Sequence, residues 1–275
     1  MGLQPLQSAC GSEPPVIRLA IAVFWLLHLL PLRLLAPLGR GVGLLAYALA
    51  GRRRRVTLTN LRLCFPQLSK VERHQLARTH FQVLARSFLE HAYLWWSPRE
   101  QVQKLVRVEG LEHWRAVEDK PVIWLAPHFV GLDMGGSRII SEWRGVSVYS
   151  KQKNLVIDRL VLHGRTRFVT PLLYSRQDGI RPVVKTMREG VPFYYLPDQD
   201  LGKRDSIFVP FFGVNTATIT GLARLARLAR AVVVPAVTRQ LPGAQGYELR
   251  FYPAWDNFPS DDVEDRKSTR LNSSH

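Results

Sequence analysis

Two residues with the types and spacing of a catalytic pair follow a short apolar segment. The segment, Val122–Ala126, lies between two prolines and predicts a buried strand. His128 comes just after it, and Asp133 opens the next segment. Open α/β sheets carry their chemistry at the carboxyl ends of strands, and a histidine there can accept a proton if a carboxylate fixes its tautomer. The spacing therefore predicts His128 as a general base and Asp133 as its orienting partner. The competing interpretation of this short pattern is a core histidine near an unrelated, helix-capping aspartate.

Two carboxylates follow a second apolar segment. Asp198 and Asp200 come after Val191–Leu196, which also predicts a buried strand. If both strands end at the same edge of one sheet, these carboxylates meet His128 and could bind hydroxyl or amine groups or hold a cationic loop. A solvated turn before Gly202 would give the same sequence pattern.

Two arginines form a third polar group. Arg165 and Arg167 lie on a helix predicted over 154–167, and a guanidinium group can bind phosphate through paired hydrogen bonds. The alternative is a solvated basic helix face. No metal is expected, because the only cysteines are Cys10 and Cys64 and the helix histidines have no second cluster of ligands.

The elements that must position these residues alternate between strands and helices. Residues 57–96 are expected to be mostly helical, with a capping box at Ser69 and Glu72. Further on, apolar runs predict strands over 146–149, 191–196, 231–237 and 247–252, and helices over 154–167, 178–188 and 221–230. The apolar segment 206–213 suits a wall for an acyl chain or a core strand. This alternation predicts an α/β fold, a central sheet flanked by helices.

Length and charge narrow the class of protein. The 275 residues can bury one sizeable core, and the formal net charge of +16 implies an anionic partner such as nucleic acid, an anionic membrane or an acidic protein. Leu19–Leu32 contains no formally charged residue and continues into further leucines, so it predicts a marginal membrane span or a buried interfacial helix. The run Arg52–Arg55 favours the cytoplasmic face and anionic lipid headgroups. A signal peptide cleaved after Ala48–Ala50 is the competing interpretation.

Several motifs in order resemble the late lipid A acyltransferases, the lauroyl- and myristoyl-transferring enzymes of lipopolysaccharide biosynthesis within the lysophospholipid acyltransferase superfamily. The resemblance covers roughly Val16 to Pro259 and depends on the motifs Asn60-Leu-x-Leu-Cys-Phe-Pro66, His128-Phe-Val-Gly-Leu-Asp133, Asn154-x-x-x-Asp158 with Gly164-Arg165-x-Arg167, and Leu196-Pro-Asp-Gln-Asp-Leu-Gly202 with Phe208-Val-Pro-Phe-Phe-Gly213. The glycerolipid branch has an E-G-T-R type motif where this chain has Pro197-Asp-Gln-Asp200, which favours the lipid A branch. The chain departs from the family at 149–153, where the family often has Tyr-Arg-Pro, so its donor or acceptor preference can differ.

The resemblance implies a reaction and its partners. A fatty acyl group would move from the thioester of an acyl carrier protein to a hydroxyl of a lipid A precursor at the cytoplasmic side of the cell inner membrane. His128 would be the general base and Asp133 would stabilise its imidazolium. The substrate-binding candidates would be Asn154, Asp158, Arg165, Arg167, Asp198 and Asp200. No cofactor is expected because the thioester is already activated, and no nucleic acid is expected as a partner.

The composition of the chain and the family resemblance together suggest a division into four parts. We expect a polar leader at 1–15, a membrane-anchoring region at 16–56, an acyltransferase domain at 57–262 that is truncated at its C-terminus, and a non-native tail at 263–275. Two other functions stay open at this point. One is an acyltransferase of the same superfamily that acts on a glycerophospholipid or another glycolipid. The other is a basic membrane-binding or nucleic-acid-binding protein without catalysis, whose binding would not depend on His128.

Overall fold

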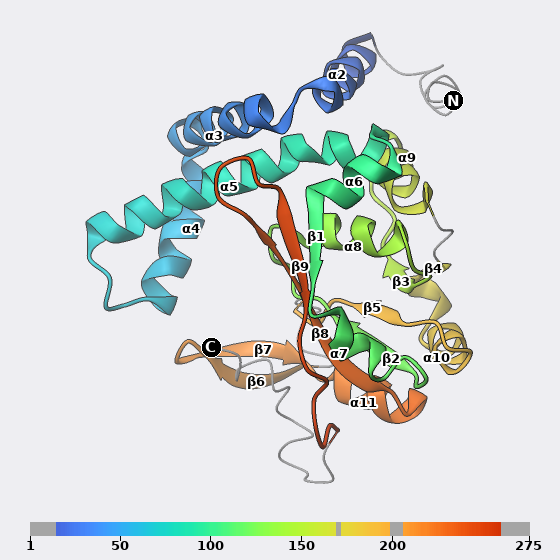
Figure 1. The fold of residues 1–275 in the computed structure, drawn as a ribbon. Coiled ribbons are helices and arrows are strands. Elements are labelled where there is room, and N and C mark those ends of the chain that lie inside the picture. Colours follow the sequence, from blue (N-terminus) through green and yellow to red (C-terminus); the bar gives the residue numbers. More distant parts are fainter. Residues whose placement is uncertain (1–14, 169–171, 199–205, 260–275) are drawn as a thin grey trace.

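The computed structural model describes residues 15–168, 172–198 and 206–259 (Figure 1). Asp200, the tail at 263–275 and all but the last residue of the polar leader lie outside these ranges. The described chain forms a sheet flanked by helices, with further helices from the N-terminal part packed along one side. The predicted α/β fold is confirmed.

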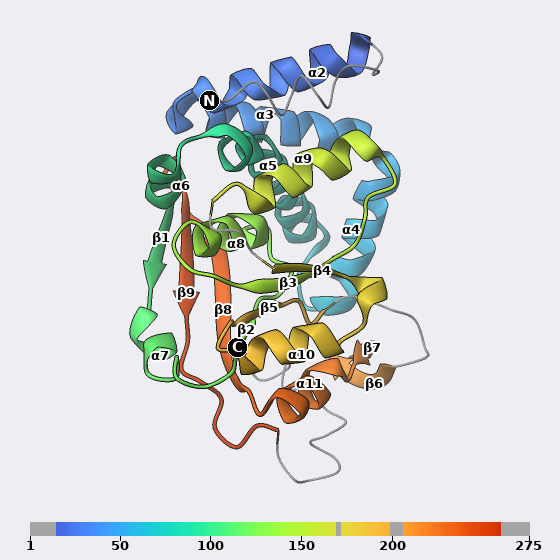
Figure 2. The ribbon, with the colours of Figure 1, turned by 90° about the vertical axis from the view of Figure 1, so that its right-hand side faces the viewer.

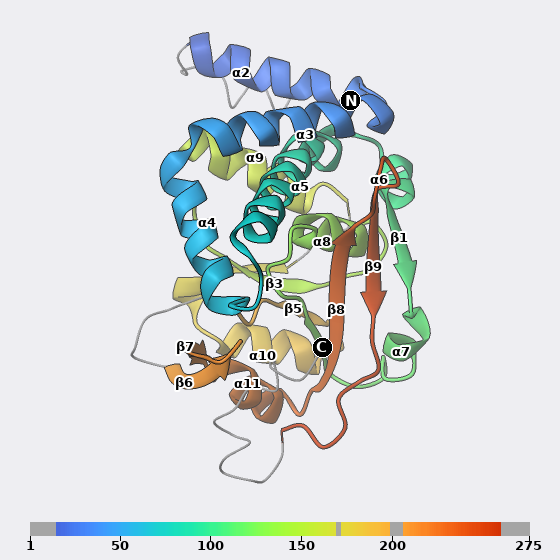
Figure 3. The same ribbon diagram turned by 90° about the vertical axis from the view of Figure 1, so that its left-hand side faces the viewer.

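The N-terminal part consists of helices that pack on one long helix. Its elements are α2 (Pro15–Leu26), the 3-10 helix η1 (Leu27–Leu29), α3 (Leu32–Leu49), α4 (Gly51–Cys64) and α5 (Lys70–Trp96). The predicted capping box at Ser69 and Glu72 begins α5. Helix α3 lies across α5, and α4 runs down beside them (Figure 3). Within the described ranges, α3 is the one helix long and apolar enough to cross a membrane.

Helix α3 has two apolar faces. Its inner face packs against α5 and includes Gly39 and Gly43, where an added Cβ would lie within 2.5 Å and 2.4 Å of α5 backbone atoms. Its outer face is a stripe of exposed residues at helical spacing: Leu34, Leu38, Val42, Leu45 and Leu49. The helix is therefore covered by protein on one side and open on the other.

The central sheet has seven strands in the order β1-β9-β8-β2-β5-β3-β4, and all neighbours are parallel except β8 and β9. The strands are β1 (Val106–Glu109), β2 (Val122–Leu125), β3 (Val146–Tyr149), β4 (Leu172–Ser175), β5 (Phe193–Tyr195), β8 (Val232–Gln240) and β9 (Tyr247–Phe251). The helices between them are α6 (Arg99–Leu105), α7 (Leu111–Arg115), α8 (Leu132–Ile140), α9 (Leu155–Thr166), α10 (Arg181–Arg188) and α11 (Gly221–Ala229). The predicted strands and helices of this region are all present, within a few residues of their expected ends. Two strands of the sheet, β1 and β4, were not predicted. A 3-10 turn, Arg176–Asp178, also precedes α10, because Gly179 has a positive φ of 72° and interrupts the helix.

Two apolar cores cover the faces of the sheet. The pleat of β2 sends Trp124 into a core shared with α5 and α8, and sends Ile123 and Leu125 into a second core shared with α10 and α11. Because β2 is buried on both faces in the middle of the sheet, its carboxyl end is held firmly where His128 follows it.

The segment 206–213 differs from both interpretations of its sequence. It forms β6 (Ser206–Phe211) of a separate antiparallel hairpin with β7 (Val214–Ile219), below the sheet in Figure 2. Phe208, Phe211 and Phe212 are exposed, and Phe212 contacts Phe65 with ring centroids 5.1 Å apart. These rings are part of neither the sheet core nor the cavity described below, because the hairpin turns away from the sheet.

Candidate active site

A histidine and a carboxylate from neighbouring strands meet at the carboxyl edge of the sheet. Strand β2 pairs with β5, and the Ala126 amide extends this pairing by donating to the Tyr195 carbonyl at 2.9 Å. The segments that follow β2 and β5 therefore begin side by side. Asp198 accepts from the His128 backbone amide at 2.8 Å and lies 2.7 Å from His128 Nδ1. Two contacts from one carboxylate fix both the turn and the ring orientation.

The partner of His128 in the structure is thus Asp198, and the predicted hydrogen bond from Asp133 to His128 is replaced by other contacts. Asp133 lies in the first turn of α8 and points toward α5 and α9. Its Oδ2 is 3.2 Å from His91 Nε2 and its Oδ1 accepts from Arg165 Nη2 at 3.0 Å. The turn between β2 and α8 reverses the chain, so closeness in sequence does not bring the Asp133 carboxylate onto the His128 ring.

His91 faces Asp133 from α5. Its Nδ1 lies 2.7 Å from the Ser87 carbonyl and its Nε2 faces the Asp133 carboxylate. Both neighbours are acceptors, so the ring satisfies both only as the doubly protonated imidazolium. Burial alone would lower the pKa of His91, but its hydrogen bond to Asp133 and the carboxylate charge outweigh burial and raise it. In the same way burial opposes the ionised form of Asp133, while His91 and Arg165 hold its pKa well below the usual range.

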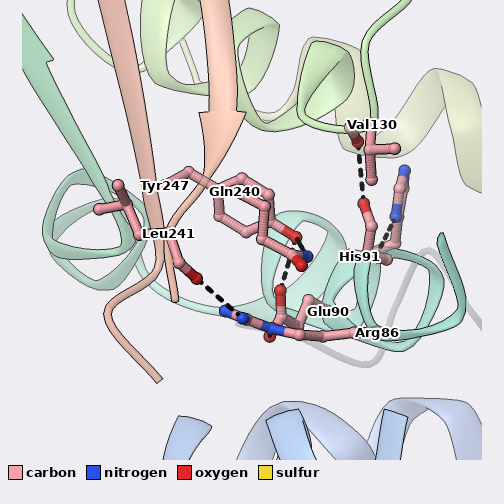
Figure 4. Close-up of polar contacts among 8 residues, drawn as sticks. Arg86, Glu90, His91, Val130, Gln240, Leu241 and Tyr247 are labelled. Carbon is pink, nitrogen blue, oxygen red and sulfur yellow. Dashed lines mark hydrogen bonds and ion pairs between the residues drawn. The ribbon is translucent and has the colours of Figure 1, made fainter. Parts of the chain in front are cut away.

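Helix α5 also holds the turn that carries His128. The Ser87 hydroxyl donates to the Val130 carbonyl at 3.0 Å (Figure 4). The preceding residue, the buried Arg86, donates to Glu90 at 2.7 Å and to the Leu241 carbonyl at 3.0 Å, which ties α5 to the end of β8. Tyr247 of β9 donates to the other oxygen of Glu90 at 2.5 Å. Burial raises the pKa of Glu90 against these contacts. The turn that carries His128 is therefore attached to the sheet through a network on α5.

A cavity of about 400 Å³ opens beside His128. His128, Asp133 and Arg165 lie among its polar lining residues. The other lining residues are largely apolar and come from α8, β3, β4, β5 and the start of α10. They include Ile140, Val148, Leu173, Phe193 and Ile180. This volume lies in the range of pockets that bind small-molecule ligands. The lining suits a long apolar chain whose reactive end reaches the polar residues.

The other predicted binding residues have structural contacts. Asn154 caps α9 by accepting from the amides of Val156 and Ile157. Asp158 is buried and accepts from the Tyr149 hydroxyl and the Gln152 amide, which shapes the loop after β3. Arg167 donates to the carbonyls of Leu94 and Ser97 and so joins α9 to the end of α5. Of the predicted arginines, Arg165 alone lines the cavity. Asp200 lies outside the described residues.

Several residues of the site carried no signal in the sequence. His91, Ser87 and Tyr194 each contact the segment 128–133 from another element, and Tyr194 donates to the Leu132 carbonyl at 3.1 Å. His91 looked like an ordinary helix-surface histidine, because its partner Asp133 lies on a different helix. In the described part of the chain, no group of three or more His, Cys, Asp or Glu side chains could hold a metal ion.

The fold and this site define an α/β protein with a largely apolar cavity that has His128, Asp133 and Arg165 among its lining residues. The model of the bacterial lipid A biosynthesis acyltransferases matches residues 15–273, and the chain belongs to that family. It is 34% identical to the lipid A biosynthesis lauroyltransferase of Escherichia coli over 90% of this chain and 81% of the relative. It is 34% identical to a lipid A biosynthesis acyltransferase of Haemophilus influenzae over 90% and 78%, and 29% identical to the palmitoleoyltransferase of E. coli over 88% and 79%. The protein is therefore an acyl-transferring enzyme, as the resemblance of its motifs predicted.

Proposed function

We propose that this enzyme transfers a fatty acyl group from an acyl carrier protein thioester to a hydroxyl of a lipid A precursor, with His128 as general base. The observation that supports it best is the His128–Asp198 pair, 2.7 Å apart, at the polar end of the apolar cavity. The relatives named for lauroyl and palmitoleoyl transfer support a long-chain acyl donor.

The pair explains how His128 would work as a base. If Nδ1–H donates to Asp198, the neutral ring carries its lone pair on Nε2. Nε2 takes the proton of the acceptor hydroxyl while the hydroxyl oxygen attacks the thioester carbonyl carbon. The tetrahedral intermediate then expels the thiolate as the carbon–sulfur bond breaks, and the imidazolium returns the proton to sulfur. Asp198 stabilises the imidazolium between these steps.

The cluster around Asp133 would bind a negatively charged group of the substrate. Two cations, His91 and Arg165, face one carboxylate, so the cluster keeps a net positive charge at the mouth of the cavity. Arg165 lines the cavity and is half-exposed, so it can turn part of its guanidinium group to a phosphate of the acceptor or to the developing oxyanion. We assign Asp133 the role of positioning Arg165.

The proposed reaction also implies that no cofactor is needed and that the enzyme works at a membrane. The thioester is already activated, so the reaction needs no cofactor. The apolar outer face of α3 and the run Arg52–Arg55 on α4 support an enzyme held at the cell inner membrane, with its catalytic domain on the cytoplasmic side and anionic lipids as neighbours. Acyl carrier protein would reach it from that side.

The first experiment compares acyl transfer by the wild-type enzyme and three variants, His128→Ala, Asp198→Asn and Asp133→Asn. Solubilised protein would receive acyl carrier protein loaded with chains of several lengths and a tetra-acylated lipid A precursor, and mass spectrometry would detect the gain of one acyl group. We expect kcat to fall about 10²–10⁴-fold in both His128→Ala and Asp198→Asn. The first removes the base, and the second removes the carboxylate that fixes the tautomer of the base. We expect a smaller loss, with a raised KM for the acceptor, in Asp133→Asn.

His113→Ala is a matched control, since His113 lies on α7 away from the cavity. Full activity of Asp198→Asn with loss in Asp133→Asn would show that Asp133 is the partner of the base in the reacting enzyme. Transfer to lysophospholipid with none to the lipid A precursor would contradict the proposed acceptor.

A further inference from the structure

A second hollow of about 500 Å³ lies on the outer side of α10. Ile180, Val184 and Leu228 give it an apolar floor, and Leu228 of α11 is 42% exposed. Arg188 donates to the Leu228 carbonyl at 2.6 Å, which joins the two helices along one side. We call this hollow the α10 groove. Leu228 is the exposed apolar side chain of this floor, while Val184 and Ile180 lie under it at the edge of the second sheet core.

Cations line the rim of the α10 groove. Arg181, Lys185 and Arg188 are exposed and recur at the spacing that puts them on one face of α10. The opposite face of the helix, with Val183 and Met187, is in the sheet core. Glu189 is the carboxylate of the groove, and it lies 4.0 Å from Lys185 Nζ at the far end. The groove thus combines an apolar floor with a net positive rim.

The α10 groove adjoins the catalytic cavity. Ile180, at the start of α10, lines both hollows. The residues just before it follow β4 at the carboxyl edge of the sheet, and Arg176 there also lines the catalytic cavity. A partner seated in the groove would therefore lie beside one side of the site that receives the acyl chain.

We propose that the α10 groove docks the acidic helix of the acyl carrier protein that delivers the thioester; this inference rests on the proposed function. An amphipathic helix can lay its apolar residues on Ile180, Val184 and Leu228 while its carboxylates meet Arg181 and Lys185. The positive rim attracts an acidic protein from a distance, and the shared wall at Ile180 places the carried chain close to the cavity.

A protein partner fits this groove better than a membrane does. The exposed apolar helices α2 and α3 lie at one end of the molecule, and α10 and α11 lie toward the other (Figures 1 and 2). A bilayer that contacts α2 and α3 would leave α10 and α11 facing the solvent. The groove is also concave, which suits a single helix rather than a flat lipid surface.

The test is the double charge reversal R181E/K185E, which spares Arg188 because of its bond to Leu228. Donor kinetics would be measured with acyl carrier protein and with acyl-pantetheine, a small thioester that has no protein to dock. We expect the KM for acyl carrier protein to rise about tenfold with little change in kcat, while transfer from acyl-pantetheine is unchanged. Rising salt should raise the KM of the wild-type enzyme more than that of the variant.

The control K104E/R107E makes the same charge change on α6 and β1, at the other end of the sheet. Binding of acyl carrier protein by fluorescence anisotropy gives a second measurement that needs no turnover. Equal effects of the two double variants, an unchanged KM and binding constant, or an equal loss with acyl-pantetheine would each overturn the proposal. Loss of binding to anionic vesicles in R181E/K185E alone would assign the groove to the membrane instead. If the wild-type enzyme uses acyl-pantetheine but not acyl carrier protein, it is the proposed donor that fails.

Discussion

At the scale of single residues, the structure separates the two carboxylates that the sequence offered to His128. Asp198 contacts both the ring and the backbone of His128, while Asp133 is held between two cations. The hydrogen bond and the charge of Asp133 raise the pKa of His91, so the protonation of His91 depends on the folded enzyme. Its consequences can be measured without substrate.

His91→Gln should change the pH dependence of stability. The pKa of His91 is raised above its ordinary value of 6.5 in the folded enzyme, so its contribution is fully present below that value. It is lost as pH rises through the folded-state pKa, because the neutral ring can donate to only one of its two acceptors. We therefore expect the free energy of unfolding of the wild-type enzyme to fall by about 1–3 kcal/mol as pH rises from 6.5 through the folded-state pKa of His91.

Glutamine cannot titrate, so the fall should be absent in His91→Gln when unfolding is followed by tryptophan fluorescence in urea. His80→Gln is the control on the same helix. Burial lowers the pKa of His80, so this substitution should not remove the decrease in the free energy of unfolding as pH rises. An unchanged fall in His91→Gln would show that another group causes it.

At the scale of elements, local patterns were predictable directly, while the contact of Asp198 with His128 was predictable only on the condition that their two strands end at one edge of the sheet. The strand over 146–149 and the capping box of α5 depend on neighbouring residues, and both are present as predicted. The His128–Asp198 contact depends on the parallel pairing of β2 with β5, which a single sequence does not specify. Arg167 shows the same limit, because a basic residue on a helix face gives no sign that it will bind two carbonyls of another helix.

The close packing of α3 on α5 gives a prediction at this scale. Gly43→Ala places a methyl group 2.4 Å from the Gln82 Cα, so the helices must move apart. Gly41→Ala in the same helix meets nothing within 4 Å and is the matched control. We expect Gly43→Ala to destabilise the protein by about 1–3 kcal/mol, and Gly41→Ala to be neutral or to stabilise it by up to about 1 kcal/mol.

Thermal unfolding of both variants in one detergent would measure the difference. Equal melting temperatures would show that α3 does not pack tightly on α5 in solution. A melting temperature lowered only in Gly43→Ala would support the contact and show that the N-terminal helices are part of the folded enzyme.

At the scale of the whole molecule, an apolar surface on α3 is followed along the chain by a basic run. The stripe on α3, made of Leu34, Leu38, Val42, Leu45 and Leu49, faces outward, and Arg52–Arg55 begin the next helix. Since the inner face of α3 is covered by α5, the stripe offers one side of the helix to lipid. Apolar burial and attraction to anionic headgroups would then act together along one end of the enzyme.

The triple variant L34S/L38S/L45S should therefore bind membranes more weakly. Burying a leucine side chain contributes about 1.5–3 kcal/mol, so loss of three should lower partition into anionic vesicles by at least about a hundredfold in a flotation assay. L155S/I157S removes two exposed apolar side chains from α9 and should leave partition nearly unchanged. High salt should weaken binding of the wild-type enzyme only in part, because the apolar contribution is not screened while that of Arg52–Arg55 is. If the triple variant partitions like the wild type, the stripe does not face lipid and membrane contact must come from another surface, of which the exposed Phe208, Phe211 and Phe212 of the β6–β7 hairpin are the next to test.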